Sequence, residues 1–219
     1  GLNFLKFNFS HNGFSSENSH EFTDLEAFGN NNITIELEDL ESVIKWSCQN
    51  IADKVDLKQI YLIGHSRGGG ISILKAATNS SIKKLASWAS ISDFEKRIEN
   101  DKVNIWKKRG VVYVFNSRTN QQMPLYYQFY EDYVDNKFRF SIPNACRRLT
   151  IPTLIVHGDK DQTVCINEAE ELNKNISNSI LLKIKNADHV FNTKHPFDEK
   201  LMSNEMKKVI AETISFFKN

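Results

Sequence analysis

The sequence predicts an α/β protein with a mostly parallel sheet and helices on both faces. Short apolar runs, too brief for helices, alternate with segments whose apolar residues recur at helical spacing. Parallel strands need crossover connections, usually helices, so this alternation indicates βαβ units. The strand-like runs are residues 59–63, 85–91, 153–158 and 180–185. The helical segments are residues 33–51, 167–176 and 202–218. In such sheets, sites form at the carboxyl ends of the strands.

The N-terminal segment predicts a strand, a loop and a helix. Residues 2–9 are apolar and aromatic with alternation, so we expect a strand there. Residues 17–32 are polar and rich in turn-forming residues. From Ile33 to Ile51 the apolar residues have helical spacing, and Thr34 and Glu36 favour a helix start at this point.

The stretch around Ser66 has the pattern of a nucleophile elbow. An apolar run ends at Gly64-His65-Ser66-Arg67-Gly68, and a helical pattern to about residue 79 follows. The G-x-S-x-G pattern between a strand and a helix places a serine at the apex of a sharp turn. We expect Gly64 and Gly68 to let the strand and the helix approach each other. The alternative is an ordinary turn in which Ser66 caps the helix.

The regular alternation is interrupted between residues 93 and 148, which we interpret as an inserted lid (cap) subdomain within a single domain of residues 1–219. Residues 92–109 look helical, and residues 111–115 and 121–127 flank a polar turn, which predicts a hairpin. Aromatic residues are dense here and predict a substrate pocket, for which the candidates are Gln121, Tyr126 and Tyr130. The alternative is that the aromatic residues form the core of the lid.

A serine hydroxyl is a weak nucleophile at neutral pH and needs a base, which itself needs an orienting group. His189 follows the last predicted strand and is the candidate base. Of the other histidines, His65 adjoins Ser66 and should point away from it, His157 lies within a strand end, and His195 lies in a polar loop.

The candidate acid follows the preceding strand. Asp161 is favoured, and Asp159 is interpreted as a turn residue that binds the amides of its own loop. Asp188 adjoins His189 and is disfavoured for that reason. The chain order is then Ser66, Asp161, His189, which is the order found in α/β-hydrolases.

Three motifs and their order make the sequence resemble the α/β-hydrolase superfamily over nearly its whole length. Within the superfamily it is similar to bacterial carboxylesterases, close to cinnamoyl (feruloyl) esterases. The motifs are Gly64-His65-Ser66-Arg67-Gly68-Gly69, His157-Gly158-Asp159-Lys160-Asp161-Gln162-Thr163-Val164 and Ala187-Asp188-His189.

The resemblance implies an oxyanion hole of two backbone N–H groups, and the first belongs to Arg67. The second should come from a loop after an earlier strand. In the family, a helix, a strand and a second helix separate that loop from the strand that leads to the nucleophile. Here only one helix and no strand fit between Gly13 and Gln59. Residues 2–9 therefore resemble the strand that follows the oxyanion loop, and not the strand that precedes it. We therefore expect a fold that is N-terminally incomplete, lacks the oxyanion loop and has low activity.

Composition and charge limit the partners and cofactors that we expect. The net charge of +1 gives no reason to expect nucleic-acid or membrane binding, and no apolar run approaches the ~20 residues of a membrane span. Three cysteines without metal-ligand spacing predict free thiols and a cytoplasmic protein. We expect neither a metal nor another cofactor.

The leading hypothesis is a serine hydrolase that cleaves small-molecule carboxylic esters through an acyl-enzyme. The alternatives are a peptidase or amidase with the same triad, and a catalytically impaired hydrolase-like binding protein. The sequence does not determine the oligomeric state or the natural substrate.

Overall fold

The computed structural model describes residues 1–15, 21–116, 119–194 and 197–219. The chain divides into two compact units, which we describe separately. Unit 1 comprises Gly1–Asn3, Ile51–Phe94 and Ser141–Asn219. Unit 2 comprises Phe4–Asn50 and Glu95–Phe140.

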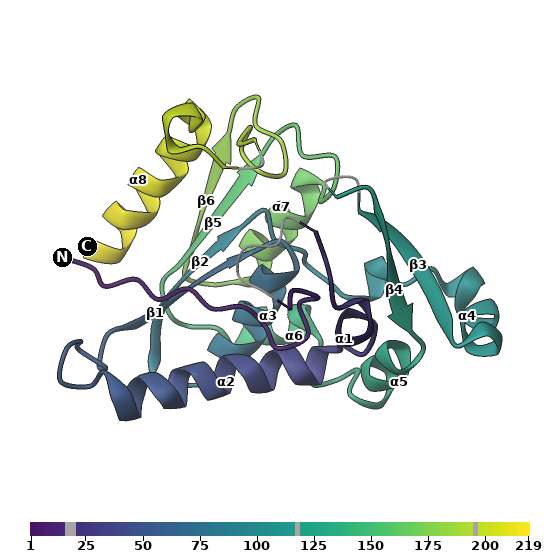
Figure 1. Ribbon diagram of the computed structural model, residues 1–219. Coiled ribbons are helices and arrows are strands. Elements are labelled where there is room, and N and C mark those ends of the chain that lie inside the picture. The colour runs from purple at the N-terminus through teal and green to yellow at the C-terminus, as the bar shows by residue number, and fades with distance from the viewer. Residues whose placement is uncertain (16–20, 117–118, 195–196) are drawn as a thin grey trace. The chain divides into compact units, whose positions relative to one another are not determined.

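Unit 1 is built on a fully parallel sheet with the order β1-β2-β5-β6 (Figure 1). The strands are β1 (Ile60–His65), β2 (Ile82–Trp88), β5 (Thr153–Gly158) and β6 (Ser179–Ile184). All six residues of β5 are buried, as expected for a strand covered on both faces. The carboxyl ends of the strands are in register, with His65 paired to Trp88 and Gly158 to Ile184. The sequence-based prediction of a parallel α/β sheet is confirmed.

Helices cover both faces of this sheet (Figure 1). They are α3 (Arg67–Ala76), α6 (Ile142–Arg148), α7 (Ile166–Asn175) and α8 (Asn204–Lys218), with a short 3-10 turn, η3 (Glu199–Leu201). Helix α3 packs on β1 and β2, α7 packs on β5 and β6, and α6 packs against both helices. Helix α8 packs on the face that carries Leu154 and Val156, and it contributes Val209 and Phe217 to that core.

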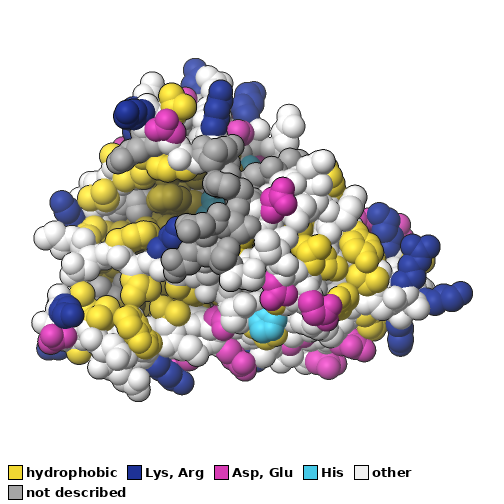
Figure 2. Space-filling model, viewed as in Figure 1, with side chains coloured by type: hydrophobic (Ala, Val, Ile, Leu, Met, Phe, Trp, Pro, Cys, Tyr) yellow, Lys and Arg dark blue, Asp and Glu magenta, His cyan; other side chains and the backbone are white. Residues whose placement is uncertain are grey.

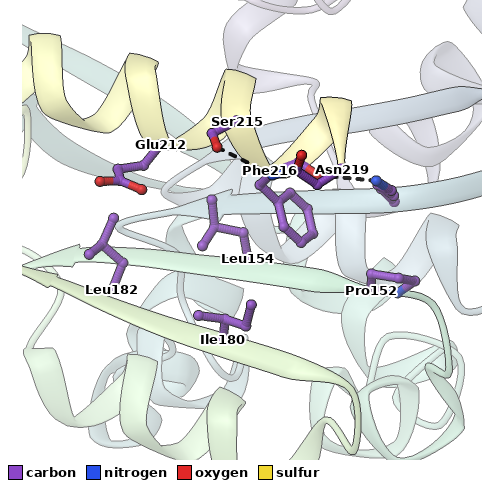
Figure 3. A pocket seen from close by; sticks show the side chains of 9 residues that line it. Pro152, Leu154, Ile180, Leu182, Glu212, Ser215, Phe216 and Asn219 are labelled. Carbon is purple, nitrogen blue, oxygen red and sulfur yellow. Dashed lines mark hydrogen bonds between the residues drawn. The ribbon is translucent and has the colours of Figure 1, made fainter.

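A cavity of about 440 Å³ lies between α8 and this face of the sheet (Figure 3). Its lining is mostly apolar and includes Leu154, Ile180 and Phe216. Pro152 immediately precedes β5, and Ile180 lies at the start of β6, so the cavity is near the amino ends of the strands. It is therefore at the opposite end of the sheet from Ser66.

Unit 2 combines helices with an antiparallel hairpin. Its elements are α1 (Leu25–Gly29), α2 (Ile33–Asn50), η1 (Glu95–Arg97), η2 (Asn100–Lys102), α4 (Val103–Arg109), β3 (Val111–Asn116), β4 (Gln121–Tyr126) and α5 (Gln128–Asp135). The predicted hairpin is confirmed, with Val111 paired to Tyr126 and Asn116 to Gln121. Figure 2 shows basic side chains gathered at α4, whose last turn carries Lys107, Lys108 and Arg109.

Hydrogen bonds join the two segments of unit 2. The side chain of Gln121 accepts from Phe22 N–H and donates to Phe22 C=O, each at 2.9 Å. Asp132 accepts from both the backbone N–H and the hydroxyl of Thr34. The centre of the predicted lid thus shares a unit with residues 4–50, whereas Ser141–Arg148 at its end groups with the sheet.

Two secondary-structure predictions are wrong. Residues 2–9 form no strand, because they make no ladder with any strand in the described part of the chain, and an extended segment needs such a partner. The helix expected over residues 92–109 is instead two 3-10 turns followed by α4. The short helix α1 was not predicted; Asp24 caps it by accepting from Ala27 N–H.

Candidate active site

Ser66 lies at a sharp turn between β1 and α3. Its backbone has φ 54° and ψ −123°, a region that a non-glycine residue rarely adopts. A Cβ at Gly64 would lie 2.3 Å from the carbonyl oxygen of Gly68 and 2.5 Å from Ser72 Oγ. Only glycine therefore permits this close approach of the strand to the helix.

The second close approach involves Gly69, not Gly68 as the pattern predicted. A Cβ at Gly68 would meet no described heavy atom within 4 Å. At Gly69 it would lie 2.4 Å from Ser90 Oγ. The expectation for Gly68 is therefore wrong on steric grounds. The reading of Ser66 as a helix cap is also wrong, because its side chain makes no capping hydrogen bond.

The structure brings together Ser66, His189 and Asp161 in one chain of hydrogen bonds. Ser66 Oγ lies 3.0 Å from His189 Nε2, and His189 Nδ1 lies 2.7 Å from Asp161 Oδ2. The carboxylate can only accept, so Nδ1 carries a proton and Nε2 is left to accept from the serine hydroxyl. This is the tautomer that a general base for Ser66 requires.

The Asp161 carboxylate is fully buried and held by several donors. Its Oδ1 accepts from the N–H groups of Thr163 at 2.8 Å and Val164 at 2.9 Å. Burial opposes ionisation, but hydrogen bonds from His157, His189 and Val164 outweigh it and hold the pKa of Asp161 well below its usual range. The group therefore remains an anion beside His189.

The loop after β6, residues 185–192, has its own supports; we call it the His189 loop. Asp188 Oδ1 accepts from the N–H groups of Val190 at 3.0 Å and Asn192 at 2.7 Å. Phe191, fully buried and at φ 55°, anchors the loop in the core under α8. Asp188 is thus occupied by the turn, consistent with its rejection as the acid.

Asp159 ties the two loops together. Its Oδ1 accepts from Asn186 N–H at 2.7 Å, so it binds the neighbouring loop. The sequence-based expectation that Asp159 binds the amides of its own loop is therefore wrong. Gly158 permits this approach, because a Cβ there would lie 2.2 Å from Ala187 O. The difference arises because the partner of Asp159 lies on another strand end, 27 residues along the chain.

Two histidines that the sequence analysis set aside as the base, His65 and His157, lie next to the triad. The Nε2 atom of His65 donates to the backbone carbonyl of His189 at 2.8 Å. As expected, its ring makes no bond to the adjacent Ser66 but contacts the His189 ring, with centroids 4.8 Å apart. His157 Nε2 lies 3.3 Å from Asp161 Oδ2. Its only sequence signal was its position at a strand end, one residue before a glycine.

The three predicted pocket residues make their contacts within unit 2. Gln121 binds the backbone of Phe22, and the Tyr126 hydroxyl donates to Glu26 at 2.6 Å. The Tyr130 ring lies against the rings of Trp106 and Tyr127. Their role in a substrate pocket stays a prediction.

The described residues contain neither a cluster of metal ligands nor a membrane-spanning helix. No group of three or more His, Cys, Asp or Glu residues in this part of the chain could hold a metal ion. No described helix is long and apolar enough to cross a membrane. His195, named as a candidate from the sequence, lies outside the described residues.

Comparisons with solved structures identify the fold. The esterase domain of a Rhodothermus marinus protein matches with a TM-score of 0.54 and 18% identity, covering 86% of this chain and 68% of that one. Est1E from Butyrivibrio proteoclasticus with bound ferulic acid matches with a TM-score of 0.57 and 20% identity, covering 86% and 72%. A monoacylglycerol lipase from Paleococcus ferrophilus matches with a TM-score of 0.62 and 14% identity, covering 87% and 77%.

These similarities establish an α/β-hydrolase fold. A comparison with curated proteins gave no significant match. A family model named BD-FAE matches residues 26–176, which is more than half of the sequence. The chain belongs to the BD-FAE family, an esterase-type family of α/β-hydrolases.

Proposed function

We propose that this protein is a serine esterase that hydrolyses carboxylic esters through an acyl-enzyme. The observation that carries the proposal is the hydrogen-bond chain from Ser66 Oγ through His189 to Asp161. It lies at the carboxyl ends of parallel strands, where α/β proteins build their sites. Membership of an esterase-type family supports the same chemistry.

In the proposed reaction, Ser66 Oγ attacks the acyl carbon while its proton passes to His189 Nε2. The tetrahedral intermediate collapses, the bond to the leaving alcohol breaks, and His189 returns the proton to that oxygen. A water molecule then attacks the acyl-enzyme and gives its proton to His189. The bond between the acyl carbon and Ser66 Oγ then breaks, His189 returns the proton to Oγ, and the carboxylic acid leaves.

Arg67 N–H is the proposed oxyanion donor. Arg67 is the first residue of α3, directly after the nucleophile, so the helix dipole also favours negative charge at this point. We propose that the described chain supplies only this donor. Loss of one donor typically costs about 10²–10³-fold in rate, so slow ester turnover is expected even with a complete triad.

Esters of hydroxycinnamic acids are the proposed substrate class. Est1E, one of the structural neighbours, binds ferulic acid. Hydroxycinnamate esters are therefore compared with simple p-nitrophenyl esters. The choice between them does not affect the assignment of the nucleophile, which depends on Ser66.

A fluorophosphonate probe tests the proposal directly. The probe should label the wild-type protein, and Ser66→Ala should abolish labelling and ester hydrolysis while leaving the melting temperature within a few degrees. Labelling that survives in Ser66→Ala would refute the assignment of the nucleophile. Labelling without hydrolysis of any ester would favour a catalytically impaired hydrolase-like protein.

A further inference from the structure

His157 is a fully buried histidine with one unpaired polar atom. It lies in β5, paired to Lys183 of β6, and its exposed fraction is 0%. In the described part of the chain, Nδ1 has no hydrogen-bond partner. Buried polar atoms are nearly always paired, and an unpaired one destabilises the fold, so an apolar side chain would fill this position at lower cost. A reason for a histidine at this position must therefore come from its other nitrogen, Nε2.

That other nitrogen faces two oxygen atoms. His157 Nε2 lies 2.8 Å from the carbonyl oxygen of Val164 and 3.3 Å from Asp161 Oδ2. Both oxygens can only accept, so the neutral ring has its proton on Nε2 and none on Nδ1. The tautomer is thus fixed by the same contacts that leave Nδ1 unpaired.

These contacts complete the set of donors around the carboxylate. Asp161 Oδ1 accepts two backbone N–H groups and Oδ2 accepts from His189, while the Nε2–H group of His157, which donates to Val164 O, lies 3.3 Å from Oδ2. Four N–H groups therefore surround the carboxylate, and its rotation would break the three hydrogen bonds that it accepts from Thr163, Val164 and His189. Only the His157 donor comes from a strand of the sheet, because the others belong to loops.

We propose that His157 is a positioning residue that fixes the orientation of Asp161, and through it the orientation and tautomer of His189. It also closes the loop of residues 159–164 by holding Val164 O. The inference deepens the proposed esterase function and rests on it for its kinetic consequences. The effect on the His189–Asp161 hydrogen bond can be measured without substrate, because this bond is present in the free protein.

Three substitutions separate this role from simple filling of space. In Gln, the amide nitrogen is four bonds from Cα, as His Nε2 is, so His157→Gln keeps a donor at the required place. In Asn, the nitrogen is three bonds away and matches Nδ1, so His157→Asn loses that donor. His157→Leu is apolar and removes both nitrogens.

Ser87 provides a matched control. It lies in β2, is fully buried, and its Oγ also has no partner among the described residues. It makes no bond to the triad, so Ser87→Ala removes a buried unpaired polar atom beside β5 without changing the donors of Asp161. We expect Ser87→Ala to keep the kcat of the wild type.

The readouts are kcat and KM for an ester, melting temperature, and the ¹H NMR resonance of the His189 Nδ1 proton. His157→Leu and His157→Asn should lower kcat by about ten- to hundredfold, the loss expected for one hydrogen bond to a charged group, with KM little changed. They should also shift or broaden the Nδ1 proton resonance. His157→Gln should restore both, even if its melting temperature is no higher.

The outcomes distinguish this inference from the proposed function. An unshifted Nδ1 resonance in folded His157→Leu and His157→Asn would overturn the inference, as would a kcat for His157→Gln as low as that of His157→Asn. If the wild type hydrolyses no ester and resists the fluorophosphonate, the proposed function fails. The NMR comparison still decides the role of His157 in that case.

Discussion

Replacing Asp161 with asparagine should inactivate the protein without removing any atom that fills space. Two backbone N–H groups, at 2.8 and 2.9 Å, face Oδ1, so the amide oxygen of the introduced asparagine should remain at that position. The amide NH₂ then takes the position of Oδ2 and faces His189 Nδ1. Since this group donates, His189 must accept at Nδ1 and carry its proton on Nε2.

The consequence is a base that cannot accept the Ser66 proton. With Nε2 protonated, the 3.0 Å contact between His189 Nε2 and Ser66 Oγ reverses its direction. The NH₂ group also opposes the Nε2–H of His157. The corresponding substitution in a Ser-His-Asp triad lowers kcat by about 10⁴-fold, or about 5 kcal/mol of transition-state stabilisation. We expect a loss of this size.

The assay is kcat/KM on a p-nitrophenyl ester together with the rate of fluorophosphonate labelling. Asp159→Asn is the matched control, because Asp159 lies two residues away and binds Asn186 N–H through an oxygen that asparagine retains. It should keep activity within about tenfold of the wild type. If folded Asp161→Asn retains more than a tenth of wild-type activity, the tautomer argument is refuted.

Two further predictions concern the elbow and the response to acid. Gly64→Ala should destabilise the protein by about 1–3 kcal/mol or more, because the added Cβ meets the Gly68 carbonyl oxygen. Gly68→Ala, in helix α3, should be neutral or stabilise the protein by up to about 1 kcal/mol. Thermal melts of the two variants measure this difference. Equal destabilisation would contradict the steric difference between the two glycines. The pKa of Asp161 is lower in the folded state, so its ionisation stabilises the fold above the unfolded-state pKa of about 4, and this stabilisation is lost as the pH falls through the folded-state pKa. Denaturant melts should therefore show the wild type losing stability more steeply than Asp161→Asn below about pH 4, and parallel curves would argue against a charged Asp161.

Much of the fold could be predicted because the signals are local. The apolar run at 153–158 is β5 to the residue, and the helical spacing from Ile33 gives α2 within one residue of its observed end at Asn50. The candidate triad also followed from local signals, since each residue lies three or four positions beyond the end of a predicted strand. Strand ends that carry reactive side chains meet at one edge of a parallel sheet, and this shared topology brings Ser66, Asp161 and His189 together.

The errors arise where a residue depends on a distant partner. The alternation at residues 2–9 is typical of a strand, but a strand forms only when another strand takes its hydrogen bonds. Asp159 has the composition of a turn residue, yet its partner is Asn186 on a different loop. The glycine pattern likewise named Gly68, while the close contact with Ser90 occurs at Gly69.

By itself, the sequence determined the α/β class, the elbow and the order of the candidate triad, because hydrophobic period, glycine spacing and strand ends are properties of neighbouring residues. Only the tertiary structure decided which N–H groups surround Asp161, which glycine the packing requires, and that the buried His157 lies beside the acid. These depend on distances between strand ends and loops that are separated along the chain. Such distances are set by the packing of the whole sheet, and no local pattern encodes them.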